Sequence, residues 1–500
     1  MGNPLWEALF APHEGAGTPF LHLPDGAVLT HGAFLDRAAR MATALRQAGA
    51  GPGDRIAVQV EKCPDMLAVY AACVKAGIVF LPQNTAYTPA EVDYFVGDSG
   101  ARLLLADPAA EGLAAVVERH GAALMTLAGG GAGSLAAAAD GAAPMARVEA
   151  AGEDDLAAIL YTSGTTGRSK GAMLSQRNLL SNAQALATAW GFTADDVLIH
   201  ALPIFHTHGL FVATNISLLA GGAMIFLPKF DADAVIDALP RATSMMGVPT
   251  FYTRLLASER FTREAAAHMR LFVSGSAPLL AETHRAFEAR TGSRILERYG
   301  MTETNMNTSN PLVGERRAGT VGPALPGVEV KVCDGEGREL PRGEIGTVEV
   351  RGPNVFLGYW QMPEKTAEEL RPSGFFNTGD LGVMAQDGYL TIVGRAKDLV
   401  ISGGLNVYPK EVEDALDALP GVEESAVIGV PHPDLGEAVV AVVVPEAGYA
   451  PDEAGLLAGL ADLAGFKRPK RIVLVGELPR NTMGKVQKAA LRAAHAGLFG

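Results

Sequence analysis

The sequence predicts an α/β protein with a large N-terminal domain of layered sheets and helices that includes a small β-rich lobe. A small mobile α+β domain follows it at the C-terminus. Three observations lead to this prediction. The chain has 500 residues, which is too long for a single hydrophobic core. Strand patterns alternate with helix patterns up to about residue 310. The pattern then changes at 320–395 and again after 398.

The first part of the chain has the alternation that is typical of parallel sheets covered on both faces. Residues 32–50 have helical apolar spacing that ends at a Gly, and a strand pattern follows at 54–60. A helix pattern at 64–77 precedes two more short strands, VFLPQN and ARLLLAD. The Gly- and Ala-rich stretch 127–153 is interpreted as a loose surface connection.

The later part of the chain predicts two further units. Between 320 and 395, short strands alternate with Gly, Pro and Asp turns, which indicates the β-rich lobe. Residues 398–500 mix a helix, YPKEVEDALDAL, with the strands ESAVIGV, AVVAVVV and RIVLVGEL. We therefore expect an N-terminal domain at 1–394, a hinge at 395–398 and a mobile domain at 399–500.

Composition excludes several classes of function. A formal net charge of −14 argues against non-specific binding to nucleic acid and against an anionic membrane surface. The N-terminus lacks a signal-peptide pattern, and no apolar run reaches the ~20 residues of a membrane span. Cys63, Cys73 and Cys333 lack metal-ligand spacing and suit buried, reduced thiols. These features predict a cytoplasmic protein.

A Gly/Ser/Thr-rich loop with a lysine follows the apolar run DLAAILY. The segment YTSGTTGRSKGA, residues 161–172, offers backbone N–H groups, hydroxyls and one ammonium to an anion. It is not the GxxxxGK[ST] loop, and a flexible surface loop is the alternative. Composition alone therefore indicates only phosphate affinity. The candidate ligands are Thr162, Ser163, Gly164, Thr165, Thr166, Gly167 and Lys170.

This loop resembles the signature loop of the adenylate-forming superfamily, which includes acyl-CoA synthetases. Five further motifs that match the superfamily follow in the expected order: SGSAPL, ERYGMTET, TGD, GRAKDLVISGG and PRNTMGK. The resemblance covers nearly the whole chain. It implies an ATP-consuming enzyme that activates a carboxylic acid as an acyl-adenylate, with Mg²⁺ as cofactor and ATP and CoA as substrates.

The resemblance also implies roles for individual residues on the nucleotide side. Residues 162–170 would cover the β- and γ-phosphates, Thr302 would contact the α-phosphate, and Glu303 would hold Mg²⁺. The adenine would lie against Gly275, Ser276, Ala277 and the ring of Tyr299, with Gly300 and Met301 beside it. Asp380 and Arg395 would bind the ribose. A Gly-Asp pair alone is usually a turn, so the ribose assignment depends on the family.

The C-terminal motifs imply a second set of roles. Lys485, in NTMGK, would neutralise charge on the carboxylate and the α-phosphate during adenylation. Lys397 matches the hinge position, and Ser402, Gly403 and Gly404 match the loop that meets the pantetheine arm of CoA. Acylation would remove the charge of Lys485, so a lysine acetyltransferase is a possible partner. Nothing in the sequence shows that this modification occurs.

Residues near the expected acyl pocket indicate a short dicarboxylic acid. Arg254, in VPTFYTRLL, lies on a helix expected to line the pocket, where a buried arginine would need an anion. FHTHGL, VPTFYTRLL, VSGSAPL and YGMTETNMNTSNP closely resemble the malonyl-CoA synthetase family. That resemblance implies that Arg254, Ser276 and His208 hold the distal carboxylate and that Thr207 and Met306 limit substituents at the central carbon. Arg285 is a further candidate, with a solvated helix charge as the alternative.

Malonate and methylmalonate are therefore the expected acids, since one methylene in a pocket discriminates by only ~1–3 kcal/mol. Two alternatives remain at this stage. The enzyme could activate another short acid or load the thiol of a carrier protein. A regulatory nucleotide-binding protein without catalysis is disfavoured because Glu303, Lys485 and the Gly403–Gly404 loop are present.

Overall fold

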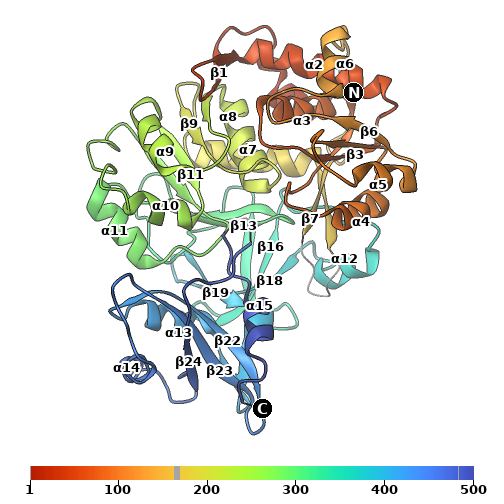
Figure 1. Cartoon of the computed structure of the whole chain (residues 1–500). Coiled ribbons are helices and arrows are strands. Elements are labelled where there is room, and N and C mark those ends of the chain that lie inside the picture. The colour runs from red at the N-terminus through yellow and green to blue at the C-terminus, as the bar shows by residue number, and fades with distance from the viewer. Residues whose placement is uncertain (1, 163–168, 482–483, 500) are drawn as a thin grey trace.

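The fold is described from a computed structural model that covers residues 2–162, 169–481 and 484–499. Two large sheets form the upper body of the protein, and a smaller unit built from the last hundred residues lies below them (Figure 1). The predicted α/β class with a large N-terminal part and a small C-terminal part is confirmed.

The eight-stranded sheet has the order β14-β13-β12-β11-β9-β10-β1-β2. Its inner strands pair in parallel, and the edge strands β14 and β2 pair antiparallel. The bounds are β14 (Asn305–Ser309), β13 (Leu296–Met301), β12 (Leu271–Ser274), β11 (Ser244–Gly247), β9 (Val197–His200), β10 (Ala223–Phe226), β1 (Pro19–His22) and β2 (Val28–Thr30).

The seven-stranded sheet has the order β17-β8-β7-β4-β3-β5-β6. The strands from β7 to β6 are parallel, whereas β8 and β17 are antiparallel additions at one edge. The bounds are β17 (Gly358–Tyr359), β8 (Lys170–Ser175), β7 (Leu156–Thr162), β4 (Val79–Pro82), β3 (Arg55–Gln59), β5 (Leu103–Ala106) and β6 (Ala123–Thr126).

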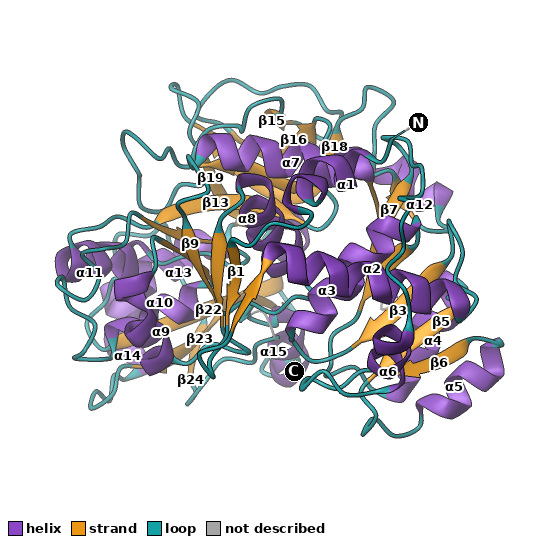
Figure 2. Cartoon of the chain, turned by 90° about the horizontal axis from the view of Figure 1, so that it is seen from above, coloured by secondary structure: helices purple, strands orange, loops and turns teal. Residues whose placement is uncertain are grey.

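Helices between the two sheets join them into one core (Figure 2). They are α1 (Pro4–Leu9), α2 (His31–Gln47), α3 (Pro64–Ala76), α7 (Gln176–Ala189), α8 (Asn215–Ala220) and a π-helix, η2 (His208–Thr214). Leu198 of β9, Ile56 of β3 and Leu67 of α3 belong to the same buried cluster. Since apolar side chains of both sheets pack on one helical layer, burial of that layer holds the body together.

The outer face of each sheet carries its own helices. α9 (Ala232–Ala238), α10 (Pro249–Leu256) and α11 (Ala281–Thr291) bury Val235, Leu255 and Phe287 against the eight-stranded sheet. α4 (Pro89–Ser99) and α5 (Leu113–His120) cover the seven-stranded sheet. Central strands such as β5, β10 and β12 are thus buried on both faces, which explains why they are mostly apolar.

The rest of the chain forms two smaller sheets. A four-stranded antiparallel sheet has the order β15-β16-β18-β19, with α12 in the connection between β16 and β18, and corresponds to the β-rich lobe. The C-terminal unit pairs β21-β20-β23-β22 with β24 on β23 and is joined to the lobe through the short 3₁₀ turn η4. The bounds are β15 (Glu329–Cys333), β16 (Ile345–Arg351), α12 (Pro363–Glu369), β18 (Phe376–Met384), β19 (Leu390–Arg395), η4 (Ala396–Asp398), β20 (Val400–Ser402), β21 (Leu405–Val407), α13 (Pro409–Asp417), β22 (Val422–His432), β23 (Gly436–Pro445), α14 (Glu453–Gly459), β24 (Arg471–Leu474) and α15 (Lys488–His495).

The interpretation of 127–153 as a loose connection was wrong in part. α6 (Ser134–Gly141) lies within it and buries Leu135, Ala136 and Ala139 against the core. Its alanines gave too little contrast with the surrounding Gly and Ala for periodicity to reveal the helix. The three cysteines are buried, as expected. Among the described residues, no helix is both long and apolar enough to cross a membrane.

One glycine between β14 and β15 should be indispensable to the fold. Gly322 has φ +77°, and a Cβ atom there would lie 2.2 Å from the backbone N of Asn310. We expect Gly322→Ala to cost roughly 2–4 kcal/mol, from overpacking and a left-handed backbone together. Gly319 is the matched control, because it has φ +79° but nothing within 4 Å of the added Cβ. Thermal unfolding measures both, and equal losses would show that the close approach is relieved elsewhere.

Candidate active site

The phosphate-loop prediction falls on the connection between β7 and β8. Thr162 is the last residue of β7, and Lys170, the first residue of β8, is its cross-strand partner. The loop therefore connects two neighbouring antiparallel strands. The intervening candidates, Ser163, Gly164, Thr165, Thr166 and Gly167, lie outside the described residues.

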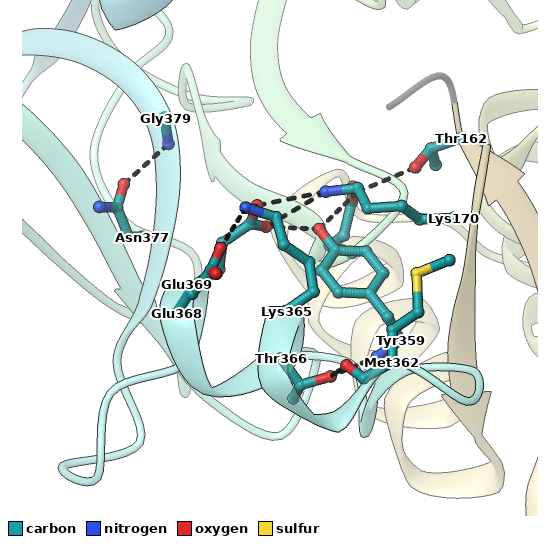
Figure 3. A network of polar contacts seen from close by, with 11 residues as sticks. Thr162, Lys170, Tyr359, Met362, Lys365, Thr366, Glu368, Glu369, Asn377 and Gly379 are labelled. Carbon is teal, nitrogen blue, oxygen red and sulfur yellow. Dashed lines mark hydrogen bonds and ion pairs between the residues drawn. The ribbon is translucent and has the colours of Figure 1, made fainter. Parts of the chain in front are cut away.

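A polar network surrounds Lys170 (Figure 3). Its Nζ lies 3.2 Å from Oε1 of Glu369 and 4.0 Å from the ring centre of Tyr359. The hydroxyl of Tyr359 donates to Oε2 of Glu369 at 2.6 Å, and Lys365 lies 3.0 Å from Oε1 of the same carboxylate. Burial alone would raise the pKa of Glu369, but the hydrogen bonds from Tyr359 and the two lysines outweigh it and lower that pKa. Glu369 is thus an ionised partner of the loop lysine.

Glu303 connects this network to the eight-stranded sheet. It lies in the turn between β13 and β14, next to the half-buried Thr302, and only 5% of its surface is exposed. Its Oε1 accepts a hydrogen bond from Thr162 at 3.3 Å and lies 3.1 Å from the hydroxyl oxygen of Tyr359. Burial raises the pKa of Glu303, and nearby Lys170 opposes this shift. The arrangement places a buried carboxylate where the two ends of the loop meet.

Tyr299, Asp380 and Arg395 form a second polar group. The Tyr299 hydroxyl donates to Oδ2 of Asp380 at 2.6 Å, and Nε of Arg395 lies 2.9 Å from Oδ1. Asp380 and Arg395 are cross-strand partners on β18 and β19, so the sheet register brings them together. The charge of Asp380 raises the pKa of Arg395, while burial raises that of Tyr299 well above its usual value. Gly300 and Met301 follow on β13, half-buried.

Ser276 and His208 lie together at the end of β12. Ser276 has φ +71°, which is rare for a non-glycine residue, and its Oγ is 3.2 Å from Nδ1 of His208. Ala277 follows, half-buried. His208 begins η2, the π-helix, and its Nε2 is buried without a hydrogen-bond partner among the described residues. Burial, then the nearby Arg298, holds the pKa of His208 well below its usual value. The ring is therefore neutral at neutral pH.

The sequence analysis missed Arg298, the most unusual residue of the site. It lies inside β13, is 4% exposed, and its Nε and Nη2 have no hydrogen-bond partner in the described part of the chain. A Cβ atom on Gly275 would lie 2.4 Å from its Cζ, so this glycine makes room for the guanidinium. Burial lowers the pKa of Arg298 to about 9. Its nearest charged or titratable neighbours include His206, His208 and Tyr252.

A signal for Arg298 was present in the sequence. It is a charged residue within ILERYGM, a strand segment directly before the aromatic Tyr299. A charge in a strand that is buried on both faces is costly unless an anion pairs with it. The sequence analysis assigned roles to Tyr299, Thr302 and Glu303 near this segment and none to Arg298.

The other predicted acyl-pocket residues are placed differently. Thr207 and Met306 are buried, and Oγ1 of Thr207 has no partner among the described residues. Arg254 is exposed on α10, so the expectation that its guanidinium is buried was wrong. It lies near the C-terminus of this short helix, on the face that also carries Thr250. Arg285 is exposed on α11.

Lys485 belongs to a loop that reaches α10 from the C-terminal unit. A Cβ atom on Gly484 would lie 3.4 Å from Oγ1 of Thr250, so this loop touches the large body. Surrounding protein, and then the charge of Arg395, lowers the pKa of Lys485 to about 8. Part of its side chain remains exposed, so water moderates the effect. The loop thus brings an ammonium to the side of the site that holds Asp380 and Arg395.

The remaining predicted residues lie at the junction and beyond it. Lys397 is exposed in η4. Ser402 is buried at the end of β20, whereas Gly403 and Gly404 are exposed in the turn to β21 with φ +59° and +79°. The structure does not bring these three together with the groups around Glu303. Within the described ranges, no three His, Cys, Asp or Glu residues form a cluster that could hold a metal ion.

Comparison with known protein families identifies the family of this chain. The sequence pattern of the AMP-binding enzymes matches residues 11–360, and that of the AMP-binding enzyme C-terminal domain matches residues 411–485. The chain belongs to the AMP-binding enzyme family. A feruloyl-CoA synthase from Amycolatopsis sp is 38% identical over 98% of this chain and 97% of its own length.

Two further relatives are named for small acids. A sulfoacetate--CoA ligase from Cupriavidus necator is 36% identical over 95% of this chain and 94% of its own. A malonate--CoA ligase from Arabidopsis thaliana is 35% identical over 89% of this chain and 78% of its own. ATP-bound MatB from Rhodopseudomonas palustris matches with a TM-score of 0.97 and 56% identity over the full length of both chains. The apo structure of MatB matches with 0.85.

The buried guanidinium of Arg298 should lower the free energy of unfolding of the protein. We expect Arg298→Met to raise the free energy of unfolding by ~1–4 kcal/mol, because a buried unpaired charge is replaced by an apolar side chain of similar length. The control Arg254→Met should change it by no more than about 0.5 kcal/mol, since that residue is exposed. Urea or thermal unfolding tests both. A loss of stability in Arg298→Met would mean that the guanidinium has a structural partner.

Proposed function

We propose that the chain is an AMP-forming ligase that converts malonate and CoA, with ATP, into malonyl-CoA, AMP and pyrophosphate through a malonyl-adenylate. The observation that carries the choice of acid is the buried guanidinium of Arg298, which lies near His208 and whose Nε and Nη2 have no hydrogen-bond partner in the part of the chain that the structure describes. It should accept methylmalonate in part, because one methyl group beside Thr207 and Met306 changes binding by only ~1–3 kcal/mol.

The electrostatics of the pocket favour an acid with two anionic groups. One carboxylate of malonate must face ATP, which leaves the other to be buried. Burying it alone would cost several kcal/mol, and a charge-assisted pair with Arg298 offsets most of that cost. His206 and His208 are neutral, since burial lowers the pKa of His206 to about 4, so they add hydrogen-bonding groups without adding charge.

The relatives support the same class of acid. Sulfoacetate and malonate, for which two of the relatives are named, each carry a second anionic group one carbon away from the carboxylate. Arg254 would add a second cation on the face of α10 that carries Thr250, and Arg285 on α11 is a further candidate. Because Arg254 is exposed, water screens its charge more than that of Arg298.

The nucleotide would occupy the groups around β13. The loop from Thr162 to Lys170 would cover the β- and γ-phosphates, and Thr302 would contact the α-phosphate. Gly275, Ser276, Ala277 and Tyr299, with Gly300 and Met301, would enclose the base. Asp380 and Arg395, already paired, would hold the ribose.

Mg²⁺ fits the residues present. Its preferred ligands are hard oxygens, and it commonly uses one or two carboxylates together with substrate phosphates. Glu303 offers a buried carboxylate oxygen beside both ends of the phosphate loop, so it would hold the ion. When bound, Mg²⁺ would neutralise phosphate charge.

Lys485 would supply the remaining positive charge for adenylation. Attack of a carboxylate on the α-phosphate brings two anions together, and an ammonium at that point stabilises the charge that develops. The higher TM-score to ATP-bound than to apo MatB supports this orientation of the C-terminal unit. Rotation at 395–398, about Lys397, would then bring Ser402, Gly403 and Gly404 to the pantetheine arm of CoA.

We place the enzyme in the cytoplasm, where buried thiols stay reduced. The exposed part of Lys485 would be accessible to a lysine acetyltransferase, and acetylation would remove the charge that adenylation needs.

The acid is tested by pyrophosphate release with malonate, methylmalonate, sulfoacetate, acetate and propionate, with and without CoA. We expect Arg298→Met to lower kcat/KM for malonate on the order of 10²-fold or more, from ~3–5 kcal/mol for a broken buried pair. Acetate and propionate should be unaffected or improved, and Arg254→Met should lose less on malonate. Equal losses for malonate and propionate would contradict the assignment. Release that requires a carrier protein instead of CoA would support the alternative acceptor.

Lys485→Ala should abolish adenylation and leave thioester formation from synthetic malonyl-adenylate and CoA intact. The control is Lys470→Ala, an exposed lysine of the same unit. The parent enzyme should lose kcat/KM for adenylation as pH rises through about 8, because the ammonium of Lys485 is then deprotonated. Equal loss of both half-reactions in Lys485→Ala would count against two separate orientations.

A further inference from the structure

The phosphate-loop lysine is paired with an anion of the protein itself. Glu369 is the last residue of α12, and its carboxylate binds Lys170 at 3.2 Å, Lys365 at 3.0 Å and the Tyr359 hydroxyl at 2.6 Å (Figure 3). The side chains of Lys170 and Glu369 are 12% and 23% exposed, so water screens this pair only partly.

A packing role for α12 does not explain the contact. None of the residues of α12 is buried, so the helix adds little to the core. Its neighbouring acid, Glu368, is 64% exposed and pairs with Lys365. Glu369 is therefore directed inward at Lys170, whereas Glu368 is directed outward from the same helix turn.

Lys170 has a second partner, Tyr359, that a bound phosphate would leave in place. The face of the Tyr359 ring lies under the ammonium at 4.0 Å, a cation–π contact that does not depend on the carboxylate. Both carboxylate oxygens of Glu369 lie near Nζ of Lys170 and offset its positive charge, so a phosphate oxygen gains less from the same ammonium. Binding of one therefore opposes binding of the other.

We propose that Glu369 is a positioning residue that acts through Lys170. Its carboxylate holds the ammonium against Tyr359 and competes with the polyphosphate of ATP or pyrophosphate for it. The consequence is weaker binding of polyphosphate and faster release of pyrophosphate after adenylation. The inference rests on the proposed function only in assigning phosphates to Lys170, and it is independent of which acid is activated.

The test is calorimetric titration of the full-length enzyme with magnesium pyrophosphate, MgATP and AMP at fixed ionic strength, without acid or CoA. In Glu369→Gln, pyrophosphate and ATP should bind about three- to tenfold more tightly, because the amide keeps the shape but loses the competing charge. AMP should bind as in the parent, since it lacks the β- and γ-phosphates. Glu368→Gln is the matched control and should change none of the three.

Unchanged or weaker binding of pyrophosphate in Glu369→Gln would overturn the proposal. A second comparison tests whether the effect passes through Lys170. In a Lys170→Met background, Glu369→Gln should lose most of its effect, because the shared partner is gone. An effect of the same size in both backgrounds would mean direct repulsion of phosphate by Glu369, which contradicts competition for the lysine. Since no acid is present, failure of the malonate assignment would leave these results unchanged.

Discussion

The pairing of β13 with β12 on one side and β14 on the other fixes both halves of the site. Successive side chains on a strand point to opposite faces. Arg298 therefore packs towards Gly275, directly after β12, and towards the histidines, while Tyr299 points to Asp380. The turn that follows carries Thr302 and Glu303. One hydrogen-bonded segment thus separates the guanidinium of Arg298 from the polar group formed by Tyr299, Asp380 and Arg395.

Much of this arrangement could be predicted from the sequence, because local pattern determines it. Alternating strands and helices gave the fold class, and the apolar run before the Gly/Ser/Thr loop indicated β7, whereas its antiparallel partner β8 was not predicted. The Asp380–Arg395 pair followed from the family motifs, and the strand register explains why they meet. In each case a short stretch of chain or one neighbouring strand decides the geometry.

Other features depend on contacts that no local pattern contains. Arg298 is buried among Gly275, His206, His208 and Tyr252, all of which are distant from it in sequence. The sequence placed Arg254 on a helix expected to line the acyl pocket, but the orientation of α10 in the fold leaves its side chain exposed. The contact of Glu369 with Lys170 joins residues 199 positions apart, through a helix that has no buried residues. For Arg298 and Glu369 the charges are visible in the sequence, but the groups that they meet are not.

The π-helix η2 has a consequence for how such a site can change in evolution. Its wider turn holds His208 against Ser276 and turns the carbonyl of Gly209 towards His200, whose Nε2 lies 2.8 Å away. Loss of a single residue here would restore an ordinary helix and rotate what precedes it by about 100° per residue removed. His208 would then leave Ser276. Descendants of this gene should therefore vary in the side chains of this segment far more readily than in its length.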